Sequence, residues 1–348
     1  MSLGLILTGG TARANVALAQ RAEAAGFDSV FGIEFFNAHA YATLGAIAAT
    51  TSRVRIGTGI ANAFTRSPVV HGTAALDLDE LSGGRMVLGL GSGTKRMNEE
   101  WFAMPFARPA ARMAELVRLL RAFFAATSGF GFRFDGEFWK VAIPVFTRPG
   151  AARTDIPIWV AGVNERMVGA AGATADALVG HPIASRRWHR ERTLPWLRAA
   201  EAAAGRASGA CKLAPYVLTS LAPTREQALR DAKGQIGFYF TVSVYHTILA
   251  FHGLPDVAAA CRAALPRFDL RAMAEAIPDA LVDEIAIACT PDEARDRLTQ
   301  WQDLGDEPLL YAPTIGVPPE RLRANLDAML AVFARKRSAQ RAEGERRS

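Results

Sequence analysis

Cysteine is scarce in this chain, and the positions of the few cysteines exclude two kinds of architecture. The 348 residues contain three cysteines, Cys211, Cys261 and Cys289, which lie far apart and form no CxxC pair. No histidine stands near them at the spacing of a zinc ligand. An odd number of isolated cysteines argues against a disulfide framework and against a structural zinc site. We therefore expect no metal site and a protein of the reducing cytoplasm.

Long hydrophobic runs are also missing. Residues 1–5 do not combine a charged start with a long apolar stretch, and no apolar window reaches 18 residues without a charge. A signal peptide needs the first pattern, and a membrane-spanning helix needs the second. The sequence therefore predicts a protein that is neither exported nor inserted in a membrane.

The chain lacks a strong charge imbalance as well. The formal net charge is +6, but residues 335–348 hold six basic and two acidic side chains, which leaves about +2 for the rest. A nucleic-acid-binding domain usually carries a clearly basic face, so nucleic acid is not an expected partner. We interpret Arg335-Lys336-Arg337 as part of a solvated, frayed end rather than as a nucleic-acid patch.

The chain does contain a regular alternation of strand-like and helix-like segments. Short apolar runs predict eight strands, at residues 3–7, 29–33, 54–60, 86–90, 156–161, 177–180, 213–221 and 308–312. Helical periodicity lies between them, for example over 16–25, 41–50, 69–81 and 108–126. Nearly continuous apolar strands are typical of a parallel sheet that is buried on both faces. Eight such units favour an α/β fold of the (β/α)8 TIM-barrel type, with an open doubly wound sheet as the alternative.

Two segments interrupt this alternation and predict insertions on the carboxyl-terminal face of the barrel. They cover about 128–156 and 234–284, and both are rich in aromatic residues. Insertions at that face commonly shape substrate pockets, whereas packing in the core or at a dimer interface is the alternative role. We expect one barrel over residues 3–335 and a basic, disordered tail over 336–348.

Two of the predicted strands run straight into small residues. Residues 57–62 read GTGIAN, and residues 89–93 read GLGSG. Glycine lets a ligand approach bare backbone, so these strand ends predict a floor on which a flat ligand can lie. Taken alone, Gly-x-Gly after a strand is also typical of a tight turn.

Segments 24–30, 55–68, 78–93 and 156–162 together resemble the bacterial luciferase-like monooxygenase superfamily. More narrowly, they resemble its branch that uses the deazaflavin coenzyme F420 and includes methylenetetrahydromethanopterin reductase. The resemblance is spread over most of residues 3–335. It implies a (β/α)8 barrel that binds FMN or coenzyme F420 at the carboxyl ends of its strands, and it implies a homodimer.

The resemblance also implies three groups of cofactor contacts. They are Gly59, Ile60 and Asn62, then Gly91, Ser92 and Gly93, and finally Ala161, Gly162 and Val163. In the first group, a non-prolyl cis peptide between Gly59 and Ile60 supports one face of the isoalloxazine ring. The second group lies near the ring or the ribityl chain. The third offers backbone N–H groups to the phosphate end, where the start of a helix favours an anion.

The expected catalytic residues are Glu34 and His181. Many deazaflavin-dependent relatives carry Asp-His or Glu-His at the end of strand two, where the histidine often acts on the substrate proton, but this chain has Glu34-Phe35. Glu34 is therefore either a cofactor contact or buried acid, or a strand-end carboxylate paired with an arginine. His181 follows the sixth strand at the catalytic end of the barrel, with a structural hydrogen-bonding role as the alternative.

Basic residues near these segments have two interpretations. Arg66 and Arg85 either neutralise the anionic tail of the deazaflavin or hold loops in place by ion pairs. Lys95-Arg96 directly follows the second glycine-rich turn and is better placed to meet such a tail.

The favoured function is hydride transfer between reduced coenzyme F420 and a small organic substrate. The first alternative is a two-component FMN-dependent monooxygenase, which uses oxygen and reduced flavin from a partner flavin reductase. The second is a flavin-binding protein without turnover. The aromatic insertions suggest an apolar or planar substrate.

Overall fold

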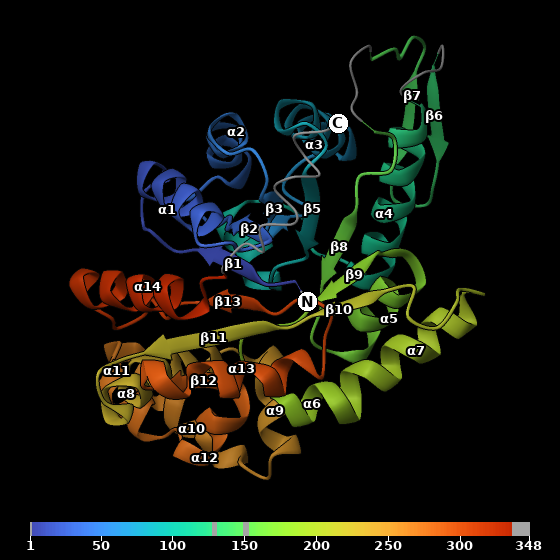
Figure 1. Cartoon of the computed structure of the whole chain (residues 1–348). Coiled ribbons are helices and arrows are strands. Elements are labelled where there is room, and N and C mark those ends of the chain that lie inside the picture. Colours follow the sequence, from blue (N-terminus) through green and yellow to red (C-terminus); the bar gives the residue numbers. More distant parts are fainter. Residues whose placement is uncertain (1, 127–130, 149–152, 336–348) are drawn as a thin grey trace.

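The computed structural model describes residues 2–126, 131–148 and 153–335. Within these residues, one parallel sheet of eleven strands forms the centre of the molecule (Figure 1). Its strands are β1 (Gly4–Leu7), β2 (Ser29–Gly32), β3 (Arg55–Thr58), β4 (Ala61–Asn62), β5 (Met86–Gly91), β8 (Ile158–Ala161), β9 (Ala177–Val179), β10 (Lys212–Ala214), β11 (Tyr216–Leu221), β12 (Ala286–Cys289) and β13 (Leu309–Tyr311).

The sheet closes into a barrel. Its strand order is β10-β9-β8-β5-β3-β2-β1-β13-β11-β12, and β4 pairs with β5. β10 pairs with β9 while β11 pairs with β13, and Pro215 alone separates β10 from β11. Because proline donates no hydrogen bond to a ladder, one long chain segment is divided into two strands there. The predicted (β/α)8 barrel is confirmed, and β12 is added beside β11 outside the ring.

Two strands differ from the prediction. The segment 54–60 forms β3 and, after Gly59 and Ile60, the chain continues into the two-residue strand β4. β12 is absent from the eight predicted strands. Its sequence Ala-Ile-Ala-Cys directly follows helix α12 (Asp279–Ile285), and a short apolar run cannot be distinguished from a buried helix end by periodicity.

Helices surround the ring. Those that alternate with the barrel strands are α1 (Ala12–Ala24), α2 (Ala40–Thr50), α3 (Pro68–Ser82), α4 (Pro109–Ala125), α5 (Glu165–Thr174), α7 (Leu194–Ala203), α8 (Arg225–Phe240), α13 (Ala294–Gln302) and α14 (Pro319–Phe333). Short helical segments are η1 (Met97–Trp101), α6 (Arg186–Trp188), η3 (His189–Thr193) and η6 (Pro291–Glu293). Helices α1 to α3 lie over the strands β1 to β5, and α14 lies beside β13 (Figure 1).

Alternate residues of the barrel strands enter two separate apolar cores. On β1, Leu5 and Leu7 pack outward in one cluster with the surrounding helices, whereas Ile6 points into the barrel in a second cluster. The inner cluster also contains Phe31 and Trp159, whose ring centroids lie 5.1 Å apart. This period of two is the pattern expected for strands that are covered on both faces.

The first predicted insertion forms an antiparallel hairpin of β6 (Phe132–Asp135) and β7 (Lys140–Ile143), which projects away from the ring (Figure 1). Glu115 of α4 anchors it, because its carboxylate accepts the backbone N–H groups of residues 137, 138 and 139 at 2.8 to 2.9 Å. Phe132 and Phe146 pack against Phe123 of α4, with ring centroids 5.2 and 4.4 Å away. These two aromatics therefore belong to the outer core.

The second predicted insertion is helical. It runs from the end of α8 through η4 (Ser243–Tyr245), α9 (His246–Phe251), α10 (Pro255–Ala264), η5 (Leu265–Arg267), α11 (Leu270–Glu275) and α12. These helices gather on the side of β11 and β12 (Figure 1). Their apolar residues continue the inner cluster of the barrel, so this insertion adjoins the strand ends where a site is expected.

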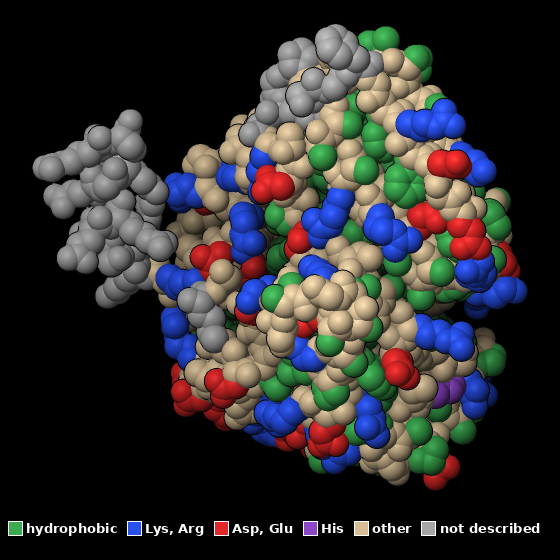
Figure 2. Space-filling view, turned by 90° about the vertical axis from the view of Figure 1, so that its right-hand side faces the viewer, with side chains coloured by type: hydrophobic (Ala, Val, Ile, Leu, Met, Phe, Trp, Pro, Cys, Tyr) green, Lys and Arg blue, Asp and Glu red, His purple; other side chains and the backbone are tan. Residues whose placement is uncertain are grey.

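One face of the molecule shows Lys and Arg side chains interspersed with Asp and Glu, without a continuous basic area (Figure 2). Among the helices of the described residues, none has the length and hydrophobicity that crossing a bilayer would require.

Candidate active site

One half of the carboxyl-terminal rim is built from residues with little or no side chain. Gly59, Gly91 and Ala161 stand at the ends of β3, β5 and β8. A Cβ atom on Gly59 would lie 2.7 Å from the Phe31 Cβ, and one on Gly91 would lie 2.5 Å from the Ile60 Cδ1. Close packing against Phe31 therefore favours glycine at position 59, and a side chain at position 91 would displace that of Ile60. Gly59 and Gly91 are buried, whereas Ile60 and Ala161 are half-buried. A flat ligand on this half of the rim would therefore contact Ile60 and Ala161 above the two glycines, and we call this half the glycine floor.

The chain bends between β3 and β4 at a cis peptide bond that joins Gly59 to Ile60. This is the bond that the luciferase-like resemblance predicts. The bend is held against β5 from both sides. The Thr58 hydroxyl donates to the Gly89 carbonyl at 2.6 Å and accepts the Gly89 N–H at 2.9 Å, and the Ala63 N–H donates to the Gly91 carbonyl at 2.9 Å.

Asn62 carries a buried side-chain donor that no acceptor of the described residues satisfies. The residue is 4% exposed, and its side-chain Nδ2 has no hydrogen-bond partner among the described residues. Its Oδ1 lies 3.8 Å from the point that a Cβ on Gly93 would occupy, so the amide faces the second glycine-rich turn. Leaving a buried donor unpaired costs about 1 to 3 kcal/mol. An oxygen of a bound ligand would satisfy this donor.

The turn at Gly93 is fixed by a second asparagine. Gly93 has a φ of 62°, and buried Asn98 donates through Nδ2 to the carbonyls of Ser92 at 2.7 Å and Thr94 at 2.9 Å. The Ser92 hydroxyl donates to the Gly93 carbonyl at 3.1 Å. Ser92 and Gly93 are half-buried, so they form a preformed and accessible wall beside Asn62.

Residues 161–163 lead into the amino-terminal end of α5. Asn164 occupies the N-cap position, but its side chain does not cap the helix. Its amide instead donates to the Val244 carbonyl at 3.1 Å and accepts the Thr247 hydroxyl at 3.0 Å, which ties α5 to the helical insertion. The helix start therefore keeps the positive end of its dipole uncapped by that side chain. Arg166, in the first turn, is exposed and has no ion-pair partner in the described part of the chain.

Glu34 lies in a paired environment. Arg66 donates to both carboxylate oxygens, from Nη1 at 2.7 Å and from Nη2 at 2.8 Å, and the Asn62 N–H donates to Oε1 at 3.0 Å. Glu34 is 8% exposed. Of the two interpretations, the geometry matches the strand-end carboxylate paired with an arginine. The ion pair holds the backbone of Asn62 in place behind the floor.

The other basic candidates also have partners. The Arg85 guanidinium donates to the carbonyls of Ala48, Thr51 and Val54, at the amino-terminal side of β3 and β5. Lys95 and Arg96 are exposed and pair with glutamates one helical turn later, Glu99 and Glu100, at 3.1 and 2.9 Å. Arg66 and Arg85 thus hold loops in place, which is one of the two roles considered for them.

The other half of the rim is aromatic. His181 follows β9, and its ring centroid lies 4.3 Å from that of Tyr245 and 4.8 Å from that of Tyr239. Tyr216 and Tyr311 stand on β11 and β13, with ring centroids 5.1 Å apart. His181 thus contacts Tyr239 and Tyr245, and four of the five tyrosines of the chain lie on this half of the rim.

Hydroxyl groups connect these rings to the glycine floor. The Tyr216 hydroxyl donates to the Gly59 carbonyl at 3.5 Å, and the hydroxyls of Tyr239 and Tyr311 lie 3.3 Å apart. Ala161 and Val163 pack in the same inner cluster as these tyrosines. The predicted residues 59, 161, 163 and 181 are thus brought to one site.

Burial keeps the aromatic groups neutral. It lowers the pKa of His181 to about 3, so the imidazole is uncharged at neutral pH. It raises the pKa of Tyr245 to about 12 and the pKa of Tyr239 well above its ordinary value. Neutral phenols and a neutral imidazole can donate and accept hydrogen bonds, but His181 cannot act as an imidazolium acid at pH 7.

Three residues of this site are missing from the sequence prediction: Thr8, Tyr216 and Tyr311. Thr8 directly follows β1, and its buried hydroxyl has no partner among the described residues. Tyr216 and Tyr311 occupy inward positions of their strands. The inward alternation of each strand is a usable signal for them, provided that the strand bounds are known first.

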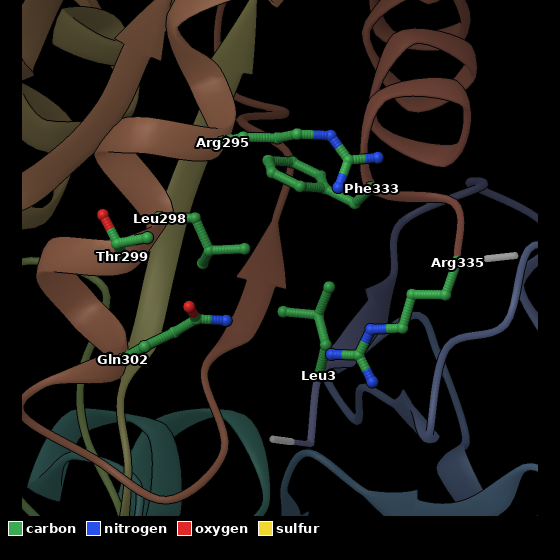
Figure 3. Close-up of a pocket in the computed structure, with 7 residues that line it drawn as sticks. All are labelled: Leu3, Arg295, Leu298, Thr299, Gln302, Phe333 and Arg335. Carbon is green, nitrogen blue, oxygen red and sulfur yellow. The ribbon is translucent and has the colours of Figure 1, made fainter.

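A pocket of about 170 Å³ lies at the opposite, amino-terminal end of the barrel (Figure 3). It separates α13 from the first residue of the barrel core, Leu3, and from Arg335. Arg335 is anchored: its N–H donates to the Ala25 carbonyl at 3.0 Å and its guanidinium to Asp28 at 2.6 Å. Grouping Arg335 with a solvated end was therefore wrong, because two contacts fix it to the barrel. Residues 336–348, the predicted tail, lie outside the described residues.

Comparison with known proteins gives three informative similarities. An uncharacterized protein of Mycobacterium tuberculosis is 35% identical over 214 residues, which are 60% of this chain and 63% of that protein. The chain thus spans somewhat less than two thirds of the mycobacterial relative. The 5,10-methylenetetrahydromethanopterin reductase of Archaeoglobus fulgidus is 28% identical over 302 residues, which are 85% of this chain and 88% of that enzyme.

Among solved structures, the coenzyme F420-dependent tetrahydromethanopterin reductase of Methanopyrus kandleri superposes with a TM-score of 0.82 at 20% identity, covering 94% of this chain and 97% of that one. This similarity supports the fold. The family model described as luciferase-like monooxygenase matches residues 3–307. That match covers most of the chain, which therefore belongs to the luciferase-like monooxygenase family.

Proposed function

We propose that this chain is an oxidoreductase that transfers a hydride between reduced coenzyme F420 and a small organic substrate at the carboxyl end of its barrel. The observation that supports a bound, flat cofactor is the buried side-chain amide of Asn62 beside the glycine floor, because its Nδ2 has no acceptor among the described residues. The family is one of flavin- and deazaflavin-dependent oxidoreductases, and the two reductase relatives support F420 over FMN.

The residues present fit such a cofactor. Gly59, Ile60 and Asn62 would support the ring and supply one donor, and residues 91–93 would border it. The backbone of residues 161–163 and the start of α5 would meet the phosphate end, with Arg166 as a nearby cation. When bound, the reduced cofactor supplies the hydride. The chain's own part is to orient the reactants, exclude water and provide a proton.

The remaining features of the proposal rest on the family resemblance. We propose a cytoplasmic homodimer in which residues 3–335 form one barrel. Glu34 acts by holding Asn62 through its bond to the backbone N–H rather than by exchanging a proton, because Arg66 occupies both carboxylate oxygens. His181 contributes a neutral hydrogen-bonding group to the substrate side.

A second candidate is FMN-dependent oxygenation, and the monooxygenase description of the family model favours it. The same glycine floor would then hold reduced flavin, and a flavin reductase would be a partner. The aromatic half of the rim suits a small apolar substrate in either case.

Titration of the apoprotein with oxidised F420 and, separately, oxidised FMN distinguishes the two, with fluorescence quenching as the measurement. We expect micromolar or tighter binding of F420 and weaker binding of FMN. Asn62→Ala should weaken binding of whichever cofactor binds more tightly. Gln302→Ala removes an amide at the opposite end of the barrel and should leave that affinity unchanged. Preference for FMN would support the monooxygenase, and binding of neither would refute both.

A further inference from the structure

Three phenolic hydroxyls link the glycine floor with the substrate side of the rim. The Tyr216 hydroxyl contacts the Gly59 carbonyl, its ring packs on Tyr311, and the Tyr311 hydroxyl meets that of Tyr239 at 3.3 Å. Tyr216 and Tyr311 are 8% and 6% exposed, whereas Tyr239 is only half-buried. Tyr239 is therefore the member of this group that a substrate can reach.

The position of Tyr239 is set by the helix that carries it. Gln235 lies one turn earlier on α8, is 2% exposed, and accepts the N–H groups of Thr314 at 3.0 Å and Ile315 at 2.9 Å. These bonds fasten α8 to the loop after β13. Residues four apart lie on one helix face, so the fastening also directs Tyr239 toward Tyr311.

Three other positions at the rim do not supply an acidic proton: position 35 is a phenylalanine, Glu34 is paired with an arginine, and His181 is neutral. Phe35 stands after β2, and its ring packs against Phe36 and Trp101 with centroids 4.7 and 5.3 Å away. Both oxygens of Glu34 accept from Arg66. His181 is neutral, because burial lowers its pKa to about 3. Reduction of a neutral C=O or C=N group by hydride nevertheless requires one proton.

We infer that the Tyr239 hydroxyl is this proton donor and that the substrate is a small, largely apolar carbonyl compound or neutral imine. The inference rests on the proposed function. The carbon of this group would receive the hydride that the bound cofactor supplies, and the π electron pair would move to the oxygen or nitrogen. That atom takes the proton of Tyr239, and the Tyr239 phenolate, which is the accessible member of the group, regains a proton from water.

The chemistry of the group suits this role. The alkoxide or nitrogen anion that would otherwise form is a much stronger base than a phenolate, so proton transfer from a phenol is downhill even though burial raises the pKa of Tyr239. The Tyr311 hydroxyl, within hydrogen-bond distance, can stabilise the negative charge on Tyr239. The rings of Tyr239, Tyr245 and His181 offer an apolar wall to the substrate body.

The test compares Tyr239→Phe with the wild type, because this change removes one oxygen and keeps the ring that packs on His181. The probes are acetophenone and ethylbenzene, which share a shape but differ in the carbonyl group. In calorimetric titrations of the apoprotein, acetophenone should bind about fivefold more weakly to Tyr239→Phe, and ethylbenzene should bind both proteins equally. Equal loss for both ligands would show a packing effect and would overturn the inference.

With reduced F420 present, Tyr239→Phe should lower kcat for acetophenone by about 100-fold with little change in the KM for F420, and Tyr311→Phe by about tenfold. Ser243→Ala is the matched control, because it removes an exposed hydroxyl from the same insertion. Unchanged kcat in Tyr239→Phe would overturn the inference. The inference would also be overturned if the wild-type protein bound F420 but neither bound nor reduced acetophenone. That result would leave F420 as the proposed cofactor. Failure to bind F420 would refute the proposed function, while the apoprotein titration would still report on Tyr239.

Discussion

The two ends of the barrel differ in how some of their buried polar groups are paired. At the amino-terminal end, buried Glu307 accepts from Ser29 and from Arg55, and Asp28 accepts the Leu3 N–H at 2.7 Å and the guanidinium of Arg335. At the carboxyl-terminal end, the Asn62 side-chain Nδ2 and the Thr8 hydroxyl are buried and have no partner among the described residues.

This difference separates polar groups that stabilise the fold from polar groups that await a ligand. A paired buried group needs no further contact, whereas an unpaired one lowers stability until something binds. In barrels of this type, active sites lie at the carboxyl-terminal face, and the opposite face contributes stability. The pocket of Figure 3 lies at the paired end, which is why its size does not make it the active site.

The first prediction concerns the stability of the whole barrel, because acid should charge three buried histidines. Burial lowers the pKa of His71 and His189 to about 4 and that of His181 to about 3, below the ordinary value of 6.5. The unfolded chain therefore takes up these protons first, so stability is full above pH 6.5 and falls as the pH drops toward 4. Each histidine contributes a slope of about 1.4 kcal/mol per pH unit.

Urea denaturation at pH 8 and pH 5 measures this effect. The expected loss is roughly 2 kcal/mol per buried histidine at pH 5. His39→Asn, which changes an exposed histidine, should show the wild-type dependence. A free energy of unfolding that stays constant over this range would contradict the prediction.

Removing a paired polar group at the amino-terminal end should lower stability without changing the affinity for the cofactor. Glu307→Ala leaves Arg55 and Ser29 without their shared acceptor, and we expect a loss of about 2 kcal/mol, since the exposed part of Arg55 moderates the penalty. Thermal unfolding and F420 titration measure the two effects separately. A variant that loses cofactor affinity while keeping its stability would show that the two ends are not independent.

Removing an unpaired polar group at the carboxyl-terminal end should lower the affinity for the cofactor without lowering stability. Asn62→Ala removes a buried donor that has no partner in the described residues, so stability should remain equal or increase slightly. Affinity for the cofactor should fall about tenfold, which corresponds to about 1.4 kcal/mol. If unfolding becomes easier and affinity is retained, Asn62 has a structural role only.

The smallest effect concerns the proposed phosphate end. Arg166→Ala removes an exposed cation from the first turn of α5, and we expect affinity for F420 to fall about threefold, roughly 0.6 kcal/mol, at low salt. The difference from wild type should vanish at high salt because exposed charges are screened. Arg13→Ala, at the start of α1, is the control for loss of one positive charge. A loss that persists at high salt would argue against an electrostatic contact.

The barrel could be predicted from the sequence because its pattern is local. Each strand is a short apolar run between helical segments, and the glycines at 59 and 91 mark strand ends directly. The cis bond after Gly59 followed from the family resemblance and is present. β12 escaped prediction because four apolar residues after a helix carry no distinctive periodicity.

The amino-acid sequence by itself determined the barrel, the bare half of its rim and the family, since these depend on residue order along short segments. Only the tertiary structure decided the partner of Glu34, the free donor of Asn62 and the gathering of His181, Tyr216, Tyr239 and Tyr311. These groups lie far apart in the chain, and burial and hydrogen bonding are properties of the space around a side chain. Barrel closure brings the carboxyl ends of distant strands together, and that proximity makes the site.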